Sequence, residues 1–236
     1  MYSANERVIL ALDVSSKQEA LKVVKGLLPE LRFVKVGMEL FFSVGPDLIH
    51  HLKDLGLKIF IDLKVHDIPN TAYNAVRSLN GLGCDIINVH CAGGLTMMKR
   101  AREAISEDTK LIGVTQLTST DQSMLNTELG IAGSVTDSVL NLARLAKEAG
   151  LHGVVCSPQE VELLKAELGK EFLAVTPGVR PLGEDTQDQK RVMTPKKAIQ
   201  AGSDYLVIGR PILKSDNPLR AFRDIVAQIQ EVDSGE

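Results

Sequence analysis

Short apolar runs alternate with longer amphipathic stretches along the chain. The apolar runs are rich in valine and isoleucine, and most are hydrophobic throughout, as is typical of parallel strands covered on both faces. We predict eight such strands, at residues 8–14, 32–38, 58–64, 86–91, 110–117, 153–157, 172–178 and 205–210.

The stretches between these runs have the periodicity of amphipathic helices. In the first of them, Ala20, Val24 and Leu27 recur at helical spacing after possible serine caps. A later one ends at Gly150, a residue type that commonly terminates helices. We predict helices at about 16–28, 45–55, 69–82, 94–105, 134–149, 158–168, 194–201 and 218–231.

Eight strands that are each followed by a helix predict a (β/α)₈ barrel of the TIM type. No linker-like segment divides the chain, so we expect one catalytic domain over residues 1–236. The alternative is an open, doubly wound sheet. Such sheets often carry a G-x-G-x-x-G turn after the first strand, whereas Asp13-Val-Ser-Ser-Lys17 stands there.

Composition narrows the classes of partner. With 44% hydrophobic residues the chain can bury a full core, and its net charge of −3 indicates neither nucleic acid nor an anionic membrane as a partner. No apolar run approaches the ~20 residues needed to span a bilayer. Cys84, Cys91 and Cys156 form no C-x-x-C pair and are expected to be buried thiols in a reducing cytosol. These features predict a soluble, cytoplasmic protein.

Charged residues stand late in otherwise apolar strands. They are Asp13, Lys35, Asp62 and Lys64. Active sites of (β/α)₈ barrels lie at the carboxyl ends of the strands, and a buried charge must pair with another or serve a ligand. Asp62 and Lys64 are two residues apart, so strand alternation should point both side chains to the same face. A purely structural salt-bridge network is the alternative.

Asp67 follows the third strand, two residues before Pro69. It suits either the start of the next helix or a functional site, and its position alone does not separate these interpretations. Thr71 is less informative still.

The end of the chain predicts an anion site. Barrels often bind phosphate with the loops that follow strands seven and eight. Here Arg180 follows the seventh strand, Gly209 allows close backbone approach, and Arg210 can donate two hydrogen bonds to phosphate. Pro211 suits the start of a short helix. Together these residues predict a phosphorylated substrate.

No residues show the spacing of metal ligands. His90 and Cys91, at the end of the fourth strand, are the residues that most resemble a pair of metal ligands. We expect His90 to be a hydrogen-bonded residue behind the site rather than a ligand.

The segment Asp62-Leu-Lys64-Val-His-Asp67-Ile68-Pro-Asn-Thr71 matches the pattern D-x-K-x-x-D-I-x-x-T. This is the signature of the orotidine 5′-monophosphate decarboxylases, and the chain resembles that family along nearly its whole length. Further matches, in the family's order, are Leu10-Ala-Leu-Asp13, Val34-Lys35-Val-Gly37, Leu117-Thr118-Ser119, Thr176-Pro-Gly-Val-Arg180 and Val207-Ile-Gly209-Arg210.

The resemblance implies decarboxylation of orotidine 5′-monophosphate to UMP in pyrimidine biosynthesis, without metal or cofactor. Lys64 would protonate C6 of the pyrimidine, within an alternating charge network formed with Lys35, Asp62 and Asp67. Asp67 would come from the second subunit of a homodimer.

The resemblance also implies substrate contacts. Asp13 and Lys35 would bind the ribose, with Thr71 joining across the interface, and Thr118 would bind the pyrimidine edge. Gln189, Gly209 and Arg210 would hold the phosphate. The stretch 180–191, which begins with Arg180, would close over the ligand, and Ile68 would complete the substrate-binding set.

Two alternatives to this function are open. One is a Mg²⁺-dependent barrel enzyme of the 3-keto-gulonate-6-phosphate decarboxylase or hexulose-6-phosphate synthase kind. These enzymes resemble the chain in the Asp-x-Lys strand but lack the His-Asp-Ile-Pro-Asn-Thr continuation. The other is a non-catalytic barrel that only binds phosphate.

Overall fold

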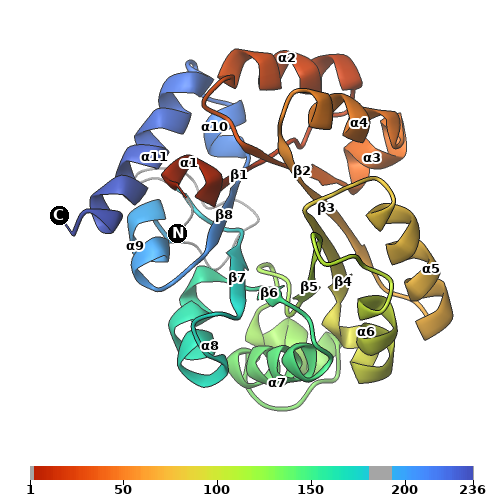
Figure 1. Ribbon diagram of the computed structural model, residues 1–236. Helices are drawn as coiled ribbons and strands as arrows, with labels where there is room; N and C mark the ends of the chain where they lie inside the picture. The colour runs from red at the N-terminus through yellow and green to blue at the C-terminus, as the bar shows by residue number, and fades with distance from the viewer. Residues whose placement is uncertain (1–2, 181–192, 236) are drawn as a thin grey trace.

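The computed structural model describes residues 3–180 and 193–235 and shows a closed barrel of eight parallel strands (Figure 1). The strands pair in chain order, and β8 closes the ring by pairing with β1. The predicted barrel is therefore confirmed. The strands are β1 (Val8–Ala11), β2 (Phe33–Gly37), β3 (Lys58–Val65), β4 (Ile86–His90), β5 (Lys110–Val114), β6 (Gly153–Val155), β7 (Leu173–Thr176) and β8 (Tyr205–Ile208).

Helices surround the barrel on its outside (Figure 1). All eight predicted helices occur, with ends shifted by a few residues. They are α2 (Lys17–Leu27), α4 (Asp47–Asp54), α5 (Pro69–Asn80), α6 (Gly94–Arg102), α7 (Val135–Glu148), α8 (Val161–Leu168), α9 (Pro195–Gln200) and α11 (Pro218–Asp233). Within the described ranges, no helix is both long and apolar enough to cross a membrane.

Short helical segments add to this pattern. They are α1 (Ala4–Arg7), α3 (Met38–Val44), α10 (Arg210–Leu213), the 3₁₀ turns Cys91–Gly93 and Pro158–Glu160, and the π turn Met124–Glu128. The expected helix after Gly209 is α10, whereas α1 and α3 were not predicted. Segments of four and seven residues are too short for helical periodicity to show in the sequence.

Several strands end earlier than the sequence predicts. β1 stops at Ala11 and β5 at Val114. Asp13, placed by the sequence in the first strand, therefore lies two residues beyond it. The apolar run continues past the end of β1 because Leu12, at the barrel mouth, is also buried. Asp13 thus belongs to the loops where barrel active sites lie.

Alternation along the strands separates two cores. The larger one fills the space between strands and helices, and includes Val34, Ile61 and Val89. The smaller one fills the barrel interior with Ile9, Ala11, Phe33, Phe60, Ile86, Ile112, Val175, Tyr205 and Val207. The next inward positions toward the mouth are polar: Lys35 above Phe33, Asp62 above Phe60, and Asn88 above Ile86. The interior is thus apolar at its base and polar at its mouth.

Candidate active site

A cavity of about 290 Å³ opens among the carboxyl ends of the strands. Its size is at the lower end of the range for small-molecule sites. Its walls combine apolar side chains of the barrel interior with charged and polar groups of the loops. The lining residues are Ala11, Asp13, Lys35, Phe60, Asp62, Lys64, Val114, Gln116, Leu117, Thr118, Ser119, Val155, Cys156, Pro177, Gly178, Arg180, Val207, Gly209 and Arg210.

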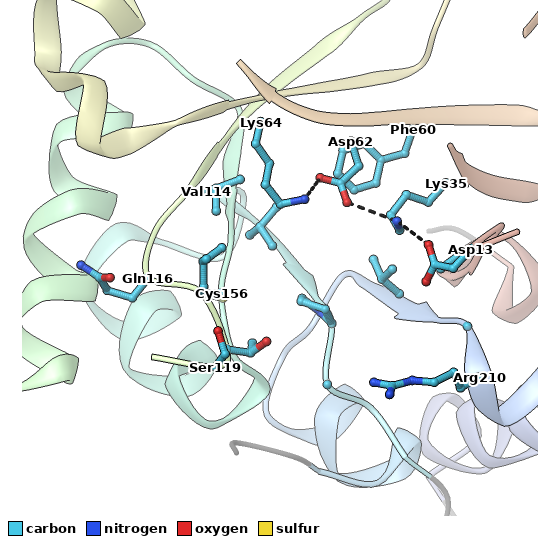
Figure 2. Close-up of a pocket in the computed structure, with 18 of the residues that line it drawn as sticks. Asp13, Lys35, Phe60, Asp62, Lys64, Val114, Gln116, Ser119, Cys156 and Arg210 are labelled. Atoms are coloured by element: carbon cyan, nitrogen blue, oxygen red, sulfur yellow. Dashed lines mark hydrogen bonds and ion pairs between the residues drawn. The ribbon is translucent and has the colours of Figure 1, made fainter. Parts of the chain in front are cut away.

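Four charged side chains form a continuous chain along one wall of this cavity (Figure 2). Lys35 Nζ lies 3.2 Å from Asp13 Oδ1 and 3.3 Å from Asp62 Oδ2. Lys64 Nζ lies 2.7 Å from the other oxygen of Asp62. Negative and positive groups therefore alternate from β1 through β2 to β3, and the Asp62 carboxylate is shared by two ammonium groups.

This pairing keeps both buried members of the chain charged. Burial alone would lower the pKa of Lys35, but the carboxylates of Asp62 and Asp13 outweigh it, and the pKa is raised. Burial likewise opposes ionisation of Asp62. The ammonium groups of Lys35 and Lys64, with hydrogen bonds from Lys64 and Asn88, hold its pKa below the usual value.

Two glycines make room for the charges. A Cβ on Gly37 would lie 3.0 Å from Lys35 Nζ, and a Cβ on Gly209 would lie 3.2 Å from Asp13 Oδ2. Such contacts are tighter than nearly all those made by real side chains. Glycine at these positions lets the strand ends of β2 and β8 approach the charge network closely.

Lys64 reaches Asp62 by a less regular route than strand alternation suggests. Between the pairs Ile61–Ile87 and Val65–Val89 the register shifts, so four residues of β3 advance against two of β4. Within this bulge Lys64 has φ of +51°, a left-handed backbone that costs on the order of 1–2 kcal/mol for a residue with a side chain. The prediction that the two side chains meet is correct, but a bulge brings them together.

Other predicted substrate-binding residues lie around the same cavity. Arg210 lies opposite the pair of Asp62 and Lys64 (Figure 2), and Thr118 is buried in the wall. Arg180 is also buried, and its Nη1 donates to the carbonyl of Val179 at 3.0 Å. Gln189 and the rest of the expected lid, residues 181–191, lie outside the described residues.

Asp67, Ile68 and Thr71 stand apart from this cavity wall. All three are exposed, and Ile68 retains 68% of its accessible surface. Asp67 Oδ1 accepts a hydrogen bond from the backbone N–H of Ile68, and the described residues offer it no ion pair. One chain by itself therefore does not bring Asp67 to Lys64.

His90 does not match its expected environment. The sequence predicts a hydrogen-bonded histidine, yet within the described chain its buried Nδ1 has no hydrogen-bond partner. Its ring instead stacks on His66, with centroids 5.4 Å apart. Burial lowers the pKa of His90, and the nearby His66 and Lys64 lower it further. The predicted hydrogen bond is therefore not formed at Nδ1 within the described residues, and the ring is stacked on His66.

Two uncharged polar residues of the site region, Asn88 and Gln116, are not among the residues that the sequence predicts for the site. Asn88 interrupts the apolar run of β4 and is 1% exposed, a signal that was visible in the sequence. Gln116 lines the cavity, but its side-chain amide points away and donates to Ser138 Oγ (Figure 2).

The described residues contain no group of three or more His, Cys, Asp or Glu side chains arranged to hold a metal ion. The acidic groups of the cavity wall, Asp13 and Asp62, are each paired with a lysine instead. The charged groups of this wall can stabilise charge that develops on a ligand, and the lysine ammonium groups can donate protons.

A sequence profile of the Orotidine 5'-phosphate decarboxylase / HUMPS family matches residues 6–225. The chain belongs to this family. Members with a curated name include the Orotidine 5'-phosphate decarboxylase of Streptococcus gordonii, 50% identical over 94% of this chain and 97% of that protein. The protein of the same name from Pseudoalteromonas translucida is 48% identical over 97% and 99% of the two chains.

Solved structures agree with the family assignment. The crystal structure of Orotidine 5'-phosphate decarboxylase from Lactobacillus acidophilus superposes with a TM-score of 0.84 at 40% identity. The match covers 94% of this chain and 98% of the other. The family fold therefore extends over nearly the whole sequence, including every element that carries the charged wall.

The shared carboxylate yields a prediction about stability. Replacing Asp62 by Asn leaves two lysines without their common counter-ion and should lower the free energy of unfolding at pH 7 by about 3–5 kcal/mol. Because the folded-state pKa of Asp62 is lowered, its contribution is fully present above the unfolded value of roughly 3.9 and is lost as pH falls through the folded value. Urea unfolding followed by circular dichroism measures both effects.

A matched control is Glu231→Gln, which removes an exposed ion pair with Lys196. Its effect should stay below about 1 kcal/mol. If Asp62→Asn were no more destabilising than this control, the carboxylate would not be the centre of the network.

Proposed function

We propose that this chain decarboxylates orotidine 5′-monophosphate to UMP and carbon dioxide in pyrimidine biosynthesis, without a metal or other cofactor. The observation that carries the proposal is the Lys64 ammonium, held 2.7 Å from Asp62 on the cavity wall opposite Arg210. Named relatives at about half identity support it. The three cysteines are free and buried, which suits a reducing compartment such as the cytoplasm.

The reaction requires a cation beside the pyrimidine. When the bond between C6 and the carboxylate breaks, carbon dioxide leaves and the electron pair stays on C6, in the ring plane, where the ring orbitals delocalise it poorly. A fixed ammonium at this position stabilises the developing charge without solvent reorganisation. Lys64 then donates its proton to C6, which forms UMP, and solvent reprotonates the amine.

The network supports this step by fixing Lys64 in place. Asp62 holds the Lys64 ammonium by a short charge-assisted hydrogen bond, and Lys35 holds Asp62 from the other side. The ammonium is therefore oriented before the substrate binds. Asp62 also places a negative charge near the carboxylate that leaves, and repulsion between the two would favour its departure.

The remaining cavity residues divide between the ends of the nucleotide. Arg210 and Gly209, with Arg180 and Gln189, bind the phosphate, and its contacts supply binding energy remote from C6. Asp13 and Lys35 bind the ribose hydroxyls, and Thr118 binds the pyrimidine edge. The positions of the charges support this orientation of the nucleotide. Arg210 and the carboxylate of Asp62 line the cavity from different sides.

We further propose that two subunits share each site. Met38, Ile68 and Leu117 follow three strands at the barrel mouth and leave 44%, 68% and 44% of their surfaces exposed. Exposed apolar side chains that gather on one face mark an interaction surface, and these three all follow strands at the same end of the barrel. In a two-fold dimer the exposed Asp67 and Thr71 of one subunit complete the other's site, with Asp67 beside Lys64 and Thr71 at the ribose. Ile68 then contacts the partner's substrate.

The proposed acid makes a direct prediction. Wild-type protein should convert orotidine 5′-monophosphate in the presence of EDTA, seen as a fall in pyrimidine absorbance. Lys64→Ala should lower kcat by at least about 10²–10⁴-fold, the contribution typical of a positioned proton donor.

Lys58→Ala is the matched control, because Lys58 lies on the same strand at the opposite end of the barrel and pairs with Glu6. It should keep wild-type turnover. Complete loss of wild-type activity in EDTA, restored by Mg²⁺, would favour the metal-dependent sugar-phosphate enzymes. Binding of UMP with no release of carbon dioxide would favour a non-catalytic barrel.

The shared site predicts complementation between two inactive variants. Lys64→Ala and Asp67→Asn subunits are mixed under conditions that allow exchange, and activity is then measured. Each heterodimer holds one wholly wild-type site, so random pairing in a two-fold dimer should restore roughly a quarter of full activity. Exchange without any recovery would place the complete site within one chain.

A further inference from the structure

Asn88 is a buried amide in the middle of β4. Only 1% of its surface is exposed, and it occupies the inward position above Ile86, where the barrel interior changes from apolar to polar. A buried amide without hydrogen bonds is strongly unfavourable, so its partners show what keeps it there.

Both ends of the Asn88 amide bind the bulged part of β3. Its Oδ1 accepts a hydrogen bond from the backbone N–H of Lys64 at 2.8 Å, and its Nδ2 donates to Asp62 Oδ1 at 2.7 Å. Only this orientation of the amide satisfies both contacts, because the backbone N–H needs an acceptor and the carboxylate needs a donor. One side chain thus bridges the two residues that the reaction requires.

These two contacts compensate for the irregular course of β3. The register shift between Ile61 and Val65 interrupts the ladder with β4, and the Lys64 N–H is bonded to the Asn88 side chain within that interruption. Lys64 also has a left-handed backbone, which persists only where its surroundings hold it. The amide therefore stabilises the conformation that directs the Lys64 ammonium to Asp62.

We infer that Asn88 is a positioning residue, which clamps the Lys64 backbone and the Asp62 carboxylate into the geometry needed for proton donation. It does not line the cavity, so its action is transmitted through these two residues. The expected change in kcat rests on the proposed function. The expected effect on the Lys64 backbone does not. A merely structural role would instead confine the effect of a substitution to stability.

The informative variant is Asn88→Asp, which has nearly the same shape. The introduced carboxyl keeps an oxygen for the Lys64 N–H. When protonated it can still donate to Asp62, and when ionised it repels Asp62. Burial and the Asp62 charge raise its pKa, while the cations Lys35 and Lys64 oppose that rise. Further ionisable groups near this position are His90, two residues along β4, His66, which stacks on it, and Asp13, which pairs with Lys35.

The clamp predicts a pH-dependent loss in this variant. Its kcat, relative to wild type at the same pH, should be lowest at high pH, by about 10²-fold, the loss expected from a ~1 Å misplacement of a catalytic group. It should recover as pH falls and the introduced carboxyl is protonated. KM should change by less than about threefold, because the phosphate and ribose contacts remain.

Asn88→Ala and Thr109→Val complete the set. Asn88→Ala removes both hydrogen bonds, so its kcat should be lower than that of the wild type at every pH. Thr109→Val removes another buried hydrogen bond, from its hydroxyl to the Cys84 carbonyl, at the start of β5 and far from the charges. It should leave kcat unchanged, which separates positioning from a general loss of buried polar contacts.

Amide hydrogen exchange at Lys64 tests the clamp without substrate. Exchange should accelerate in Asn88→Ala, which lacks the acceptor, and remain slow in Asn88→Asp. An Asn88→Ala variant with wild-type kcat or unchanged Lys64 exchange would overturn the inference, as would a pH-independent loss in Asn88→Asp. Wild-type protein without decarboxylase activity would refute the proposed function, while the exchange data would still decide whether Asn88 holds Lys64.

Discussion

The shared carboxylate of Asp62 is the interaction on which this site depends. It lies inside a closed barrel, where an unpaired charge is strongly unfavourable, and it stays ionised because Lys35 and Lys64 approach it from two sides. Asp62 is the one carboxylate among the described residues that pairs with both lysines, while Lys35 also pairs with Asp13. The ion pairs that stabilise these buried charges also hold an ammonium group at the cavity. The same interactions therefore support both the fold and the proposed chemistry. This explains why the charges begin directly above the apolar layer formed by Phe33 and Phe60.

The backbone around the network adapts to it. Gly37 and Gly209 leave space for Lys35 and Asp13, where a Cβ would lie unusually close to the charged groups. β3 bulges and Lys64 adopts a left-handed conformation, both of which are unfavourable alone. Strain concentrated at the residue proposed to donate the proton is consistent with a site whose geometry is fixed before substrate arrives. Asp67 and Thr71 are the complementary feature, since both are exposed and neither lines the cavity of its own chain.

Much of this arrangement could be predicted from the sequence. Continuous apolar strands and amphipathic helices determine the barrel, and charges late in strands indicate its active end. The meeting of Asp62 and Lys64 was predicted correctly, but alternation could not reveal the bulge, because a register shift depends on the pairing of β3 with β4 rather than on either strand alone. The first strand is shorter than predicted and does not include Asp13, because hydrophobicity does not mark where pairing between strands ends. His90 stacks on His66, a tertiary contact with no local signal in the sequence, and its Nδ1 has no hydrogen-bond partner among the described residues. Asn88 could have been recognised as a polar residue within an apolar strand.

The most direct test of this account is a crystal structure with UMP bound, which preserves every group of the substrate except the one that leaves. The account predicts the phosphate at Arg210, C6 of the pyrimidine facing Lys64 Nζ within hydrogen-bonding distance, and Asp67 of a second subunit completing the row of charges. A pyrimidine bound away from Lys64, or a phosphate seated at the charged wall of Asp62, would contradict it.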